Sequence, residues 1–131
     1  DKHMPSRRQR QMCIRDSIDH MWNGITTLNF AKIVDGMIKN NNFKTYIQHV
    51  LPKDEVSKYE LLLYFKNYFN VDVVIEESKS SNSVNRTLKT QNQDNNLKLW
   101  RDAGYKSVPT IEENIKELSE SDFTKGILNN I

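Results

Sequence analysis

Residues 56–77 read VSKYELLLYFKNYFNVDVVIEE, and this stretch decides the fold class. Ser57 and Glu60 match the S-x-x-E capping box, in which each side chain accepts a hydrogen bond from the other residue's backbone N–H. Apolar residues at helical spacing then predict a buried stripe of Leu61, Leu62, Phe65, Tyr68 and Phe69. The segment 71–77 carries apolar side chains at alternate positions, which is typical of a strand. A helix that leads directly into a strand indicates an α/β fold.

A second helix is predicted upstream of this stretch, and Thr26 or Thr27 can act as its N-cap. The apolar face expected for it consists of Leu28, Phe30, Ala31, Ile33, Val34, Met37 and Ile38. The helix is expected to end in the asparagines at 40–42, because Asn tolerates turn geometry. Residues 45–50 alternate and predict another strand, which Pro52 would end.

Downstream of residue 77 the chain becomes polar and predicts a long loop, which contains a compact NRTLKT at 85–90. The sequence LKLWRDAGY predicts a short helix that ends at Gly104. Thr110 and Glu113 form a second capping pattern and predict a further helix, and residues 119–131 are only weakly helical. The whole pattern predicts helices packed on about two short strands.

Composition narrows the class of protein. The 131 residues suit one domain, and 37% hydrophobic with 27% charged residues is typical of a globular chain. No apolar run reaches the roughly 20 residues that span a bilayer, and the first twenty residues lack a signal-peptide core. A single cysteine excludes an internal disulfide framework, and no cluster of ligands has metal spacing. We therefore expect a cytoplasmic protein with no metal and no membrane partner.

Residues 5–17, PSRRQRQMCIRDS, differ from the rest of the chain in having no apolar period. Residues 1–16 hold five of the 19 basic residues and two of the 17 acidic ones, so the remainder is near neutral. One interpretation is a basic arm for nucleic acid or a targeting signal. We favour another, because the stretch resembles the conceptual translation of a sequencing-adapter junction. We therefore expect residues 1–16, with Cys13, to be artefactual or disordered and to pack on nothing.

The ordered segments from residue 18 to residue 118 resemble the C-terminal part of the extended short-chain dehydrogenase/reductase family, close to the sugar-nucleotide reductases. The resemblance rests on the order of WNGITTLNFAKIV, TYIQHVL, VSKYELLLYF, VDVVIEE, NRTLKT and LWRDAGYKSVPTIEENIKEL. It implies a fragment of the substrate-binding region of an extended Rossmann-type reductase. Residues 17–120 would form the substrate-binding subdomain, and 121–131 a C-terminal tail.

The resemblance also implies what a longer parent protein does. It would be a homodimeric enzyme that uses NAD or NADP to reduce or epimerise a nucleoside-diphosphate keto-sugar for polysaccharide synthesis. The four glycines of this chain are too dispersed for a dinucleotide-binding turn. The family's catalytic Tyr-x-x-x-Lys is also missing, because the residues four past each tyrosine are Val50, Leu63, Tyr68, Asp72 and Pro109. We expect this chain alone to hold no catalytic or cofactor-binding residues.

Four residues are candidates for binding a nucleoside-diphosphate sugar. Arg86 in NRTLKT could grip the diphosphate in a bidentate manner, with Lys89 and Thr87 as weaker candidates. The resemblance suggests that WNGITT lines the sugar pocket, where Trp22 would stack and Asn23 or Thr26 would bond hydroxyls. The competing interpretations are a solvated loop arginine and a hydrophobic anchor at the start of a helix.

A function from another class stays open at this point. The chain could be a small non-enzymatic α/β binding module whose arginine-rich N-terminal stretch binds nucleic acid or an acidic partner. Such a module would show affinity for nucleic acid that falls steeply with salt. We prefer the sugar-nucleotide interpretation, which predicts no nucleic-acid partner.

Overall fold

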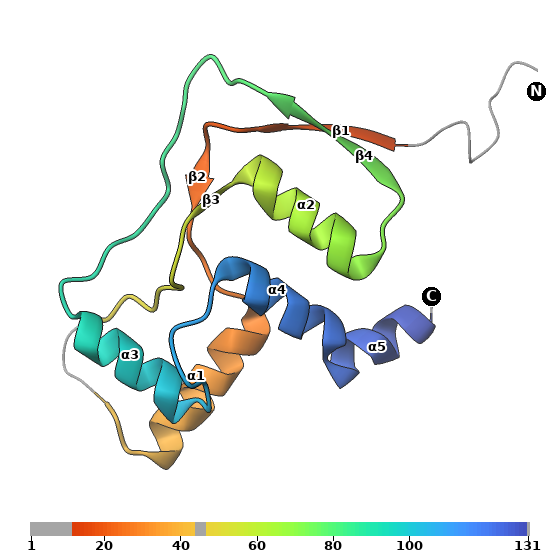
Figure 1. The fold of residues 1–131 in the computed structure, drawn as a ribbon. Coiled ribbons are helices and arrows are strands. Elements are labelled where there is room, and N and C mark those ends of the chain that lie inside the picture. The colour runs from red at the N-terminus through yellow and green to blue at the C-terminus, as the bar shows by residue number, and fades with distance from the viewer. Residues whose placement is uncertain (1–11, 44–46, 131) are drawn as a thin grey trace, which may run out of the picture.

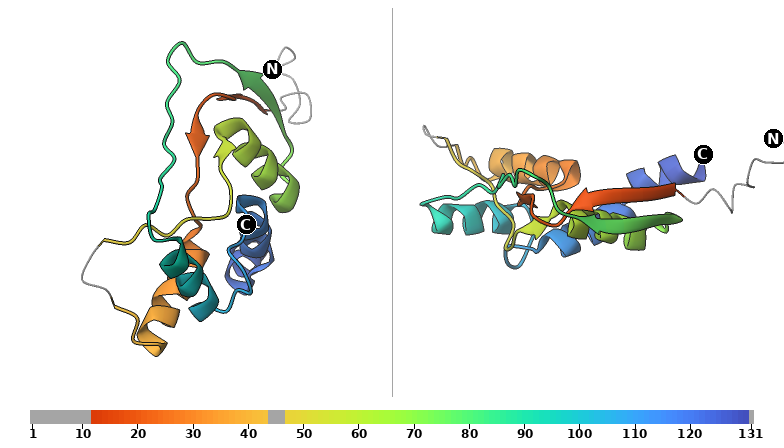
Figure 2. Two further views of the ribbon diagram at one scale, coloured as in Figure 1. Left: turned by 60° about the vertical axis from the view of Figure 1, so that its left-hand side comes forward. Right: turned by 90° about the horizontal axis from the view of Figure 1, so that it is seen from above.

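The computed structural model describes residues 12–43 and 47–130 (Figure 1). Five helices and four strands are assigned in this part of the chain. In chain order they are β1 (Met12–Ser17), β2 (Met21–Trp22), α1 (Thr27–Lys39), β3 (Val56–Ser57), α2 (Lys58–Phe69), β4 (Val73–Ser78), α3 (Gln93–Asp102), α4 (Ile111–Glu120) and α5 (Asp122–Asn129). Viewed from above, the sheet lies toward one end of a shallow arrangement and α1 and α3 toward the other (Figure 2).

A parallel pair of strands, β1 and β4, forms the larger sheet, with Met12 opposite Val73 and Ser17 opposite Ser78. Helix α2 packs on both strands. It begins after the N-cap Ser57, whose capping box with Glu60 is formed as predicted. Strand β4 confirms the strand expected at 71–77, displaced toward its C-terminal end. The α/β class, with helices packed on short strands, is confirmed.

The prediction that residues up to 16 pack on nothing is wrong for residues 12–16, which belong to β1. The backbone of this stretch pairs with β4, and Ile14 stands opposite Ile75. Arg15 Nε also lies 3.1 Å from Glu76 Oε2. An unpaired edge strand offers a row of N–H and C=O groups, and any extended segment can satisfy them whatever its origin. Residues 1–11 lie outside the described part, and the artefactual origin of the stretch stays a prediction.

The strand predicted at 45–50 is also wrong, because residues 47–50 form no regular structure; Thr45 and Tyr46 lie outside the described residues. Side chains of α3 take the backbone groups that a strand would need. Asn96 Oδ1 accepts from Leu51 N–H at 2.9 Å, and the Leu51 carbonyl accepts from Asn96 Nδ2 at 3.1 Å and from Trp100 Nε1 at 2.8 Å. The segment is therefore held by a helix instead of a sheet.

Helix α1 starts and ends where the sequence predicts, with Thr26 as N-cap and Asn40 as C-cap. Its apolar face is different from the one predicted. Ile33 packs with Leu99 and Trp100 of α3 in one buried cluster. The predicted face members Phe30, Ala31, Val34 and Ile38 are exposed. Contact with α3 decides which side of the helix is buried, and hydrophobic periodicity alone does not show it.

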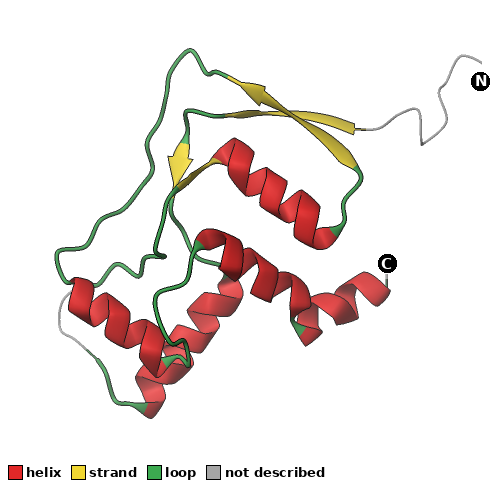
Figure 3. Cartoon of the chain, in the orientation of Figure 1, coloured by secondary structure: helices red, strands yellow, loops and turns green. Residues whose placement is uncertain are grey.

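A second cluster consists of Val56 of β3 with Ile111 and Ile115 of α4, and the α2 side chains Leu61, Phe65 and Phe69 pack against it. Helix α4 begins after Thr110 as predicted, while α3 starts earlier than expected, after the N-cap Asn92. Helix α5 forms a regular helix where only weak helicity was expected. Residues 79–92 run along one side of the molecule as a long loop (Figure 3). In the described part of the chain, no helix has both the length and the apolar character that a bilayer span requires.

Candidate functional site

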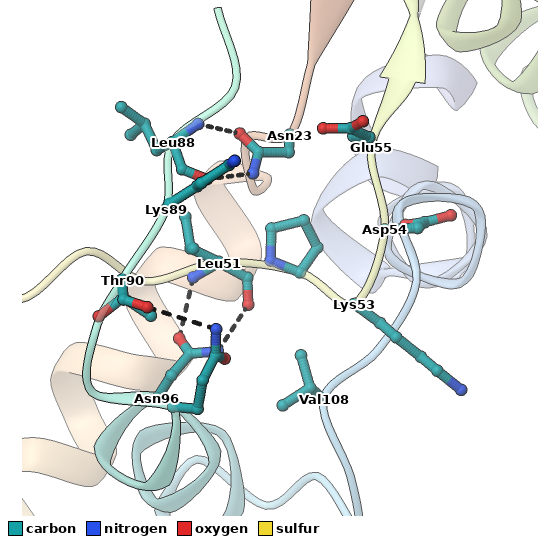
Figure 4. A pocket seen from close by; sticks show the side chains of 12 residues that line it. Asn23, Leu51, Lys53, Asp54, Glu55, Leu88, Lys89, Thr90, Asn96 and Val108 are labelled. Atoms are coloured by element: carbon teal, nitrogen blue, oxygen red, sulfur yellow. Dashed lines mark hydrogen bonds between the residues drawn. The ribbon is translucent and has the colours of Figure 1, made fainter.

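A polar cavity of about 490 Å³ lies between the loop 51–55, the loop 88–90 and the first turn of α3 (Figure 4). Its polar lining includes Asn23, Lys53, Asp54, Lys89, Thr90 and Asn96. These residues come from parts of the chain that are far apart in sequence. We call this space the polar cavity below.

Asn23 fastens the loop 88–90 to the segment after β2. Its Nδ2 donates to the Leu88 carbonyl at 2.8 Å, and its Oδ1 accepts from Leu88 N–H at 2.8 Å (Figure 4). The side chain is 8% exposed, so water competes little for these bonds. Next to it, Met21 pairs with Asn85 in an isolated parallel bridge. Asn23 therefore holds this part of the cavity wall in place. We call a side-chain amide that bonds both backbone groups of one loop residue a clamp.

Asn96 forms the matching clamp on the opposite wall, through the two bonds to Leu51 already described (Figure 4). It is 2% exposed, and Trp100 beneath it is fully buried. Each amide thus satisfies both backbone groups of one leucine in a loop without regular structure. Such pairing matters because buried backbone groups are costly when they lack partners. The two clamps fix the shape of the cavity.

Charged side chains surround the opening. Asp54 Oδ1 accepts from Ile111 N–H at 2.9 Å, at the start of α4, where the helix dipole favours a negative charge. Glu55 lies beside it in the lining. Lys53 and Lys89 are exposed, and within the described residues neither ammonium takes part in an ion pair. The lining therefore contains two lysines, whose side chains extend in different directions (Figure 4), and carboxylates that can accept from hydroxyls.

The four sequence-predicted binding residues are not brought together. Asn23 lines the polar cavity, but both polar atoms of its amide are used by Leu88. Trp22 and Thr26 line a separate apolar pocket. Arg86 is exposed and lies outside both linings, with its backbone N–H donating to the Met21 carbonyl. Their roles toward a ligand stay predictions.

Local packing explains the positions of Trp22 and Thr26. The Trp22 ring lies directly over Gly24, where a Cβ would come within 2.0 Å of Trp22 Cζ2. The Thr26 hydroxyl donates to Asn29 Oδ1 at 2.8 Å and accepts from Asn29 N–H at 3.1 Å, as an N-cap does. Both residues thereby shape the start of α1.

Sequence reasoning did not single out Lys53, and it gave Lys89 as a weaker candidate than Arg86. Lys53 follows Pro52 in a stretch without a motif, and only the fold brings it to the same cavity as Lys89. The available signal was indirect. The polar loop around NRTLKT was too compact for a mere linker, and in it the sequence favoured Arg86, whereas Leu88, Lys89 and Thr90 line the cavity.

A buried polar network lies on the other side of α1. Asn29 Nδ2 lies within 3.2 Å of Tyr105 Oη, Asn114 Oδ1 and Glu117 Oε1. Tyr105 donates to Glu117 Oε1 at 2.6 Å, and Lys32 Nζ pairs with Glu117 Oε2 at 2.9 Å. Burial, and then the bond to Glu117, raise the pKa of Tyr105. This hydroxyl keeps its proton and is poorly suited to proton transfer near neutral pH.

The four glycines do not form the glycine-rich turn of a dinucleotide-binding motif. Gly24 is covered by Trp22, and a Cβ at Gly36 would lie 2.6 Å from the Asp102 carbonyl oxygen in a helix contact. Gly104, at φ 104°, ends α3, and Gly126 lies within α5. Gly24 lies between β2 and the start of α1, but the Trp22 ring covers it, and the other three glycines do not lie between a strand and a helix. Within the described residues, no group of three acidic, histidine or cysteine side chains could hold a metal ion.

No protein-family model and no curated protein matches the sequence. Two solved structures are similar in fold. One is a dTDP-4-dehydrorhamnose reductase from Bacillus anthracis in complex with NADP, with TM-score 0.57 and 15% identity over 82% of this chain and 37% of that one. The other is a dTDP-4-dehydrorhamnose reductase from Clostridium acetobutylicum, with TM-score 0.59 and 16% identity over 91% and 40%. The chain thus shares the fold of part of these reductases, and it spans about two fifths of their length.

Proposed function

We propose that the chain is the substrate-binding portion of an NAD(P)-dependent reductase or epimerase that acts on a nucleoside-diphosphate keto-sugar. The observation that carries this proposal is the fold. At least 82% of the chain superposes on two enzymes named for dTDP-4-dehydrorhamnose. In this view residues 17–120 form the binding portion, and 121–131 are a tail.

The polar cavity is the proposed place for the activated sugar. A diphosphate carries its charge on oxygens that accept strong hydrogen bonds, and the Lys53 and Lys89 ammonium groups supply the opposite charge. Thr90 Oγ1 accepts from Asn92 N–H and from Gln48 Nε2, so its own proton stays available for a ligand oxygen. Glu55 offers a carboxylate to a sugar hydroxyl.

In this proposal, one part of the parent protein binds the sugar nucleotide and another part holds the cofactor that supplies the hydride. A nicotinamide cofactor supplies the hydride in such an enzyme. The glycines of this chain form no dinucleotide-binding turn, and in this proposal NAD or NADP is held by another part of the parent protein. The chain itself is expected to orient the sugar nucleotide and to reduce nothing alone.

Calorimetric titration with dTDP-rhamnose at low salt tests the proposal. We expect measurable binding that weakens roughly three- to ten-fold in Lys53→Gln and in Lys89→Gln, since each removes one charge-assisted contact. Raising the salt concentration should weaken binding as well. Lys116→Gln, at an exposed position on α4, is the matched control and should bind like the parent chain. Equal affinity in all three variants would refute the assignment of the cavity.

A second titration tests whether this chain binds the cofactor. NADP added to the same protein should produce no saturable heat, because the glycine geometry provides no pyrophosphate site. Saturable NADP binding that Lys53→Gln and Lys89→Gln weaken would mean that the polar cavity serves a dinucleotide instead.

A further inference from the structure

Asn23, the clamp of the loop 88–90, is followed directly in the chain by Gly24. In an asparagine–glycine pair, the backbone nitrogen of the glycine can attack the carbon of the asparagine side-chain amide. Glycine favours this attack, because it has no Cβ to hinder its own nitrogen and its backbone adopts conformations that other residues avoid. The pair occurs once in the 131-residue sequence. Nothing in the proposed function uses its reactivity.

The fold holds the Asn23 amide away from this reaction. Its Nδ2 donates to the Leu88 carbonyl and its Oδ1 accepts from Leu88 N–H, both at 2.8 Å (Figure 4). The residue is 8% exposed, so water has little access to the amide. While both bonds last, the amide cannot turn toward the Gly24 nitrogen, and Nδ2 cannot leave. The reaction therefore requires the clamp to open.

The loop that carries Leu88 is built to open more easily than the rest of the molecule. Residues 79–92 form no helix or strand, and a single bridge between Met21 and Asn85 interrupts the irregular backbone. The Leu88 side chain is 52% exposed and adds little burial to the clamp. Segments with few buried contacts open locally at a fraction of the free energy of global unfolding. Opening of the loop thus controls when Asn23 can react.

We propose that Asn23 is a site of spontaneous deamidation, controlled by opening of the loop 88–90. In the open state the Gly24 nitrogen forms a bond to Asn23 Cγ, and the bond from Cγ to Nδ2 breaks. The proton of the Gly24 N–H leaves with the NH₂ group as ammonia. Water then opens the resulting five-membered ring at one of its two carbonyl carbons, and the product is aspartate or isoaspartate. Water is the one co-reactant.

The product changes the wall of the polar cavity. A carboxylate at position 23 has no donor for the Leu88 carbonyl, so the clamp cannot re-form with both bonds. It also adds one negative charge to a lining that contains Lys53 and Lys89, which opposes the binding of an anion. The loss accumulates with the age of the protein. The deamidation itself rests on the sequence and the clamp, whatever the cavity binds.

The experiment incubates the full chain at mildly alkaline pH, with and without urea, and follows each asparagine by peptide mass spectrometry and isoaspartate detection. Asn82, which precedes Ser83 in an exposed part of the same loop, is the internal reference. In urea, Asn23 should react faster than Asn82, because serine has a Cβ and glycine has none. In the folded chain Asn23 should react at least roughly ten-fold more slowly than in urea, whereas Asn82 should change little.

Two substitutions at one position test the clamp. Leu88→Pro removes the N–H that Asn23 Oδ1 accepts, and it should raise the rate at Asn23 in the folded chain several-fold, with Asn82 unaffected. Leu88→Ala keeps both backbone groups and is the matched control, with a rate near that of the unmodified chain. If Leu88→Pro fails to fold, the comparison of the folded and urea-treated unmodified chain still decides. The proposal is overturned if Asn23 stays unmodified in the folded chain over weeks, if urea does not accelerate its reaction, or if both folded variants react alike.

Discussion

At the polar cavity, Asn23 and Asn96 each turn both polar atoms of the side-chain amide toward one backbone residue. At the apolar pocket, Asn114 has one polar atom in a network and the other in none. All three asparagines are buried, so burial does not distinguish them.

The difference distinguishes two kinds of buried amide. One kind bonds loop backbone and holds it in place, and the other keeps an unpaired donor. An amide that bonds both backbone groups of one residue keeps only one N–H and one lone pair, so recognition in the polar cavity falls mainly to Lys53, Lys89 and Thr90 at its edge. Asn114 Nδ2, in contrast, is buried and has no hydrogen-bond partner in the described part of the chain. The predictions below test this distinction through stability.

The largest loss of stability is expected for Asn96→Ala. The change leaves the buried Leu51 N–H without its acceptor and removes one of two donors to the Leu51 carbonyl. We expect the free energy of unfolding to fall by about 2–4 kcal/mol in urea denaturation. Asn95→Ala is the control on the same helix. It loses a bond to Gln48, which can turn to water, and should cost about 1 kcal/mol. Equal losses in the two variants would contradict the clamp.

Asn23→Ala should cost less, about 1–2 kcal/mol, because its partner Leu88 is 52% exposed and water can replace the lost bonds. The clearer readout is local. Hydrogen exchange at the Leu88 amide should become faster, while exchange in α3 is unchanged. An unaltered Leu88 amide would show that Asn23 does not hold this loop.

Asn114→Leu should change the free energy of unfolding by less than about 1 kcal/mol. The substitution removes an unpaired buried donor, which is favourable. It also removes one acceptor of Asn29 Nδ2, but Tyr105 Oη and Glu117 Oε1 remain within reach. A loss as large as that of Asn96→Ala would mean that the Asn114 amide is structural, against the distinction drawn here.

The smallest expected effect is on the pH dependence of the free energy of unfolding, through Tyr105 in the network that orients Asn29. Burial and the bond to Glu117 raise the pKa of Tyr105, so the unfolded chain ionises first as pH rises past the ordinary tyrosine value of about 10. The free energy of unfolding should therefore fall above that pH, and the slope should be smaller in Tyr105→Phe. A residual slope is expected, since burial raises the pKa of Tyr64 and a bond to Glu112 that of Tyr68. If the free energy of unfolding falls with pH equally in Tyr105→Phe and in the unmodified chain, Tyr105 does not contribute to the pH dependence.

The starts of α1, α2 and α4 could be predicted from the sequence, because a cap depends on residues within one turn, whereas α3 starts earlier than predicted. Thr26, Ser57 and Thr110 are all N-caps in the structure. The strand near Val73 followed from local alternation in the same way. The strand expected at 45–50 is not formed over residues 47–50, and the adjoining Leu51 backbone is bonded by Asn96, far along the chain.

The candidate site was less predictable for the same reason. Asn23 was correctly placed in the segment before α1, but its partner Leu88 comes from a distant loop. Lys53 and Lys89 share a cavity only through tertiary structure. The exposed side of α1, with Phe30 and Ile38, shows the same limit, because periodicity identifies apolar positions without showing which of them meet α3.

The central claim is that the polar cavity receives an activated sugar, and an NMR titration with dTDP-rhamnose tests it most directly. The account predicts saturable shifts of the amides at 53–55 and 88–90, with residues around Trp22 and Ile115 unmoved. Shifts confined to the apolar pocket, or no saturable shift at millimolar ligand, would contradict it.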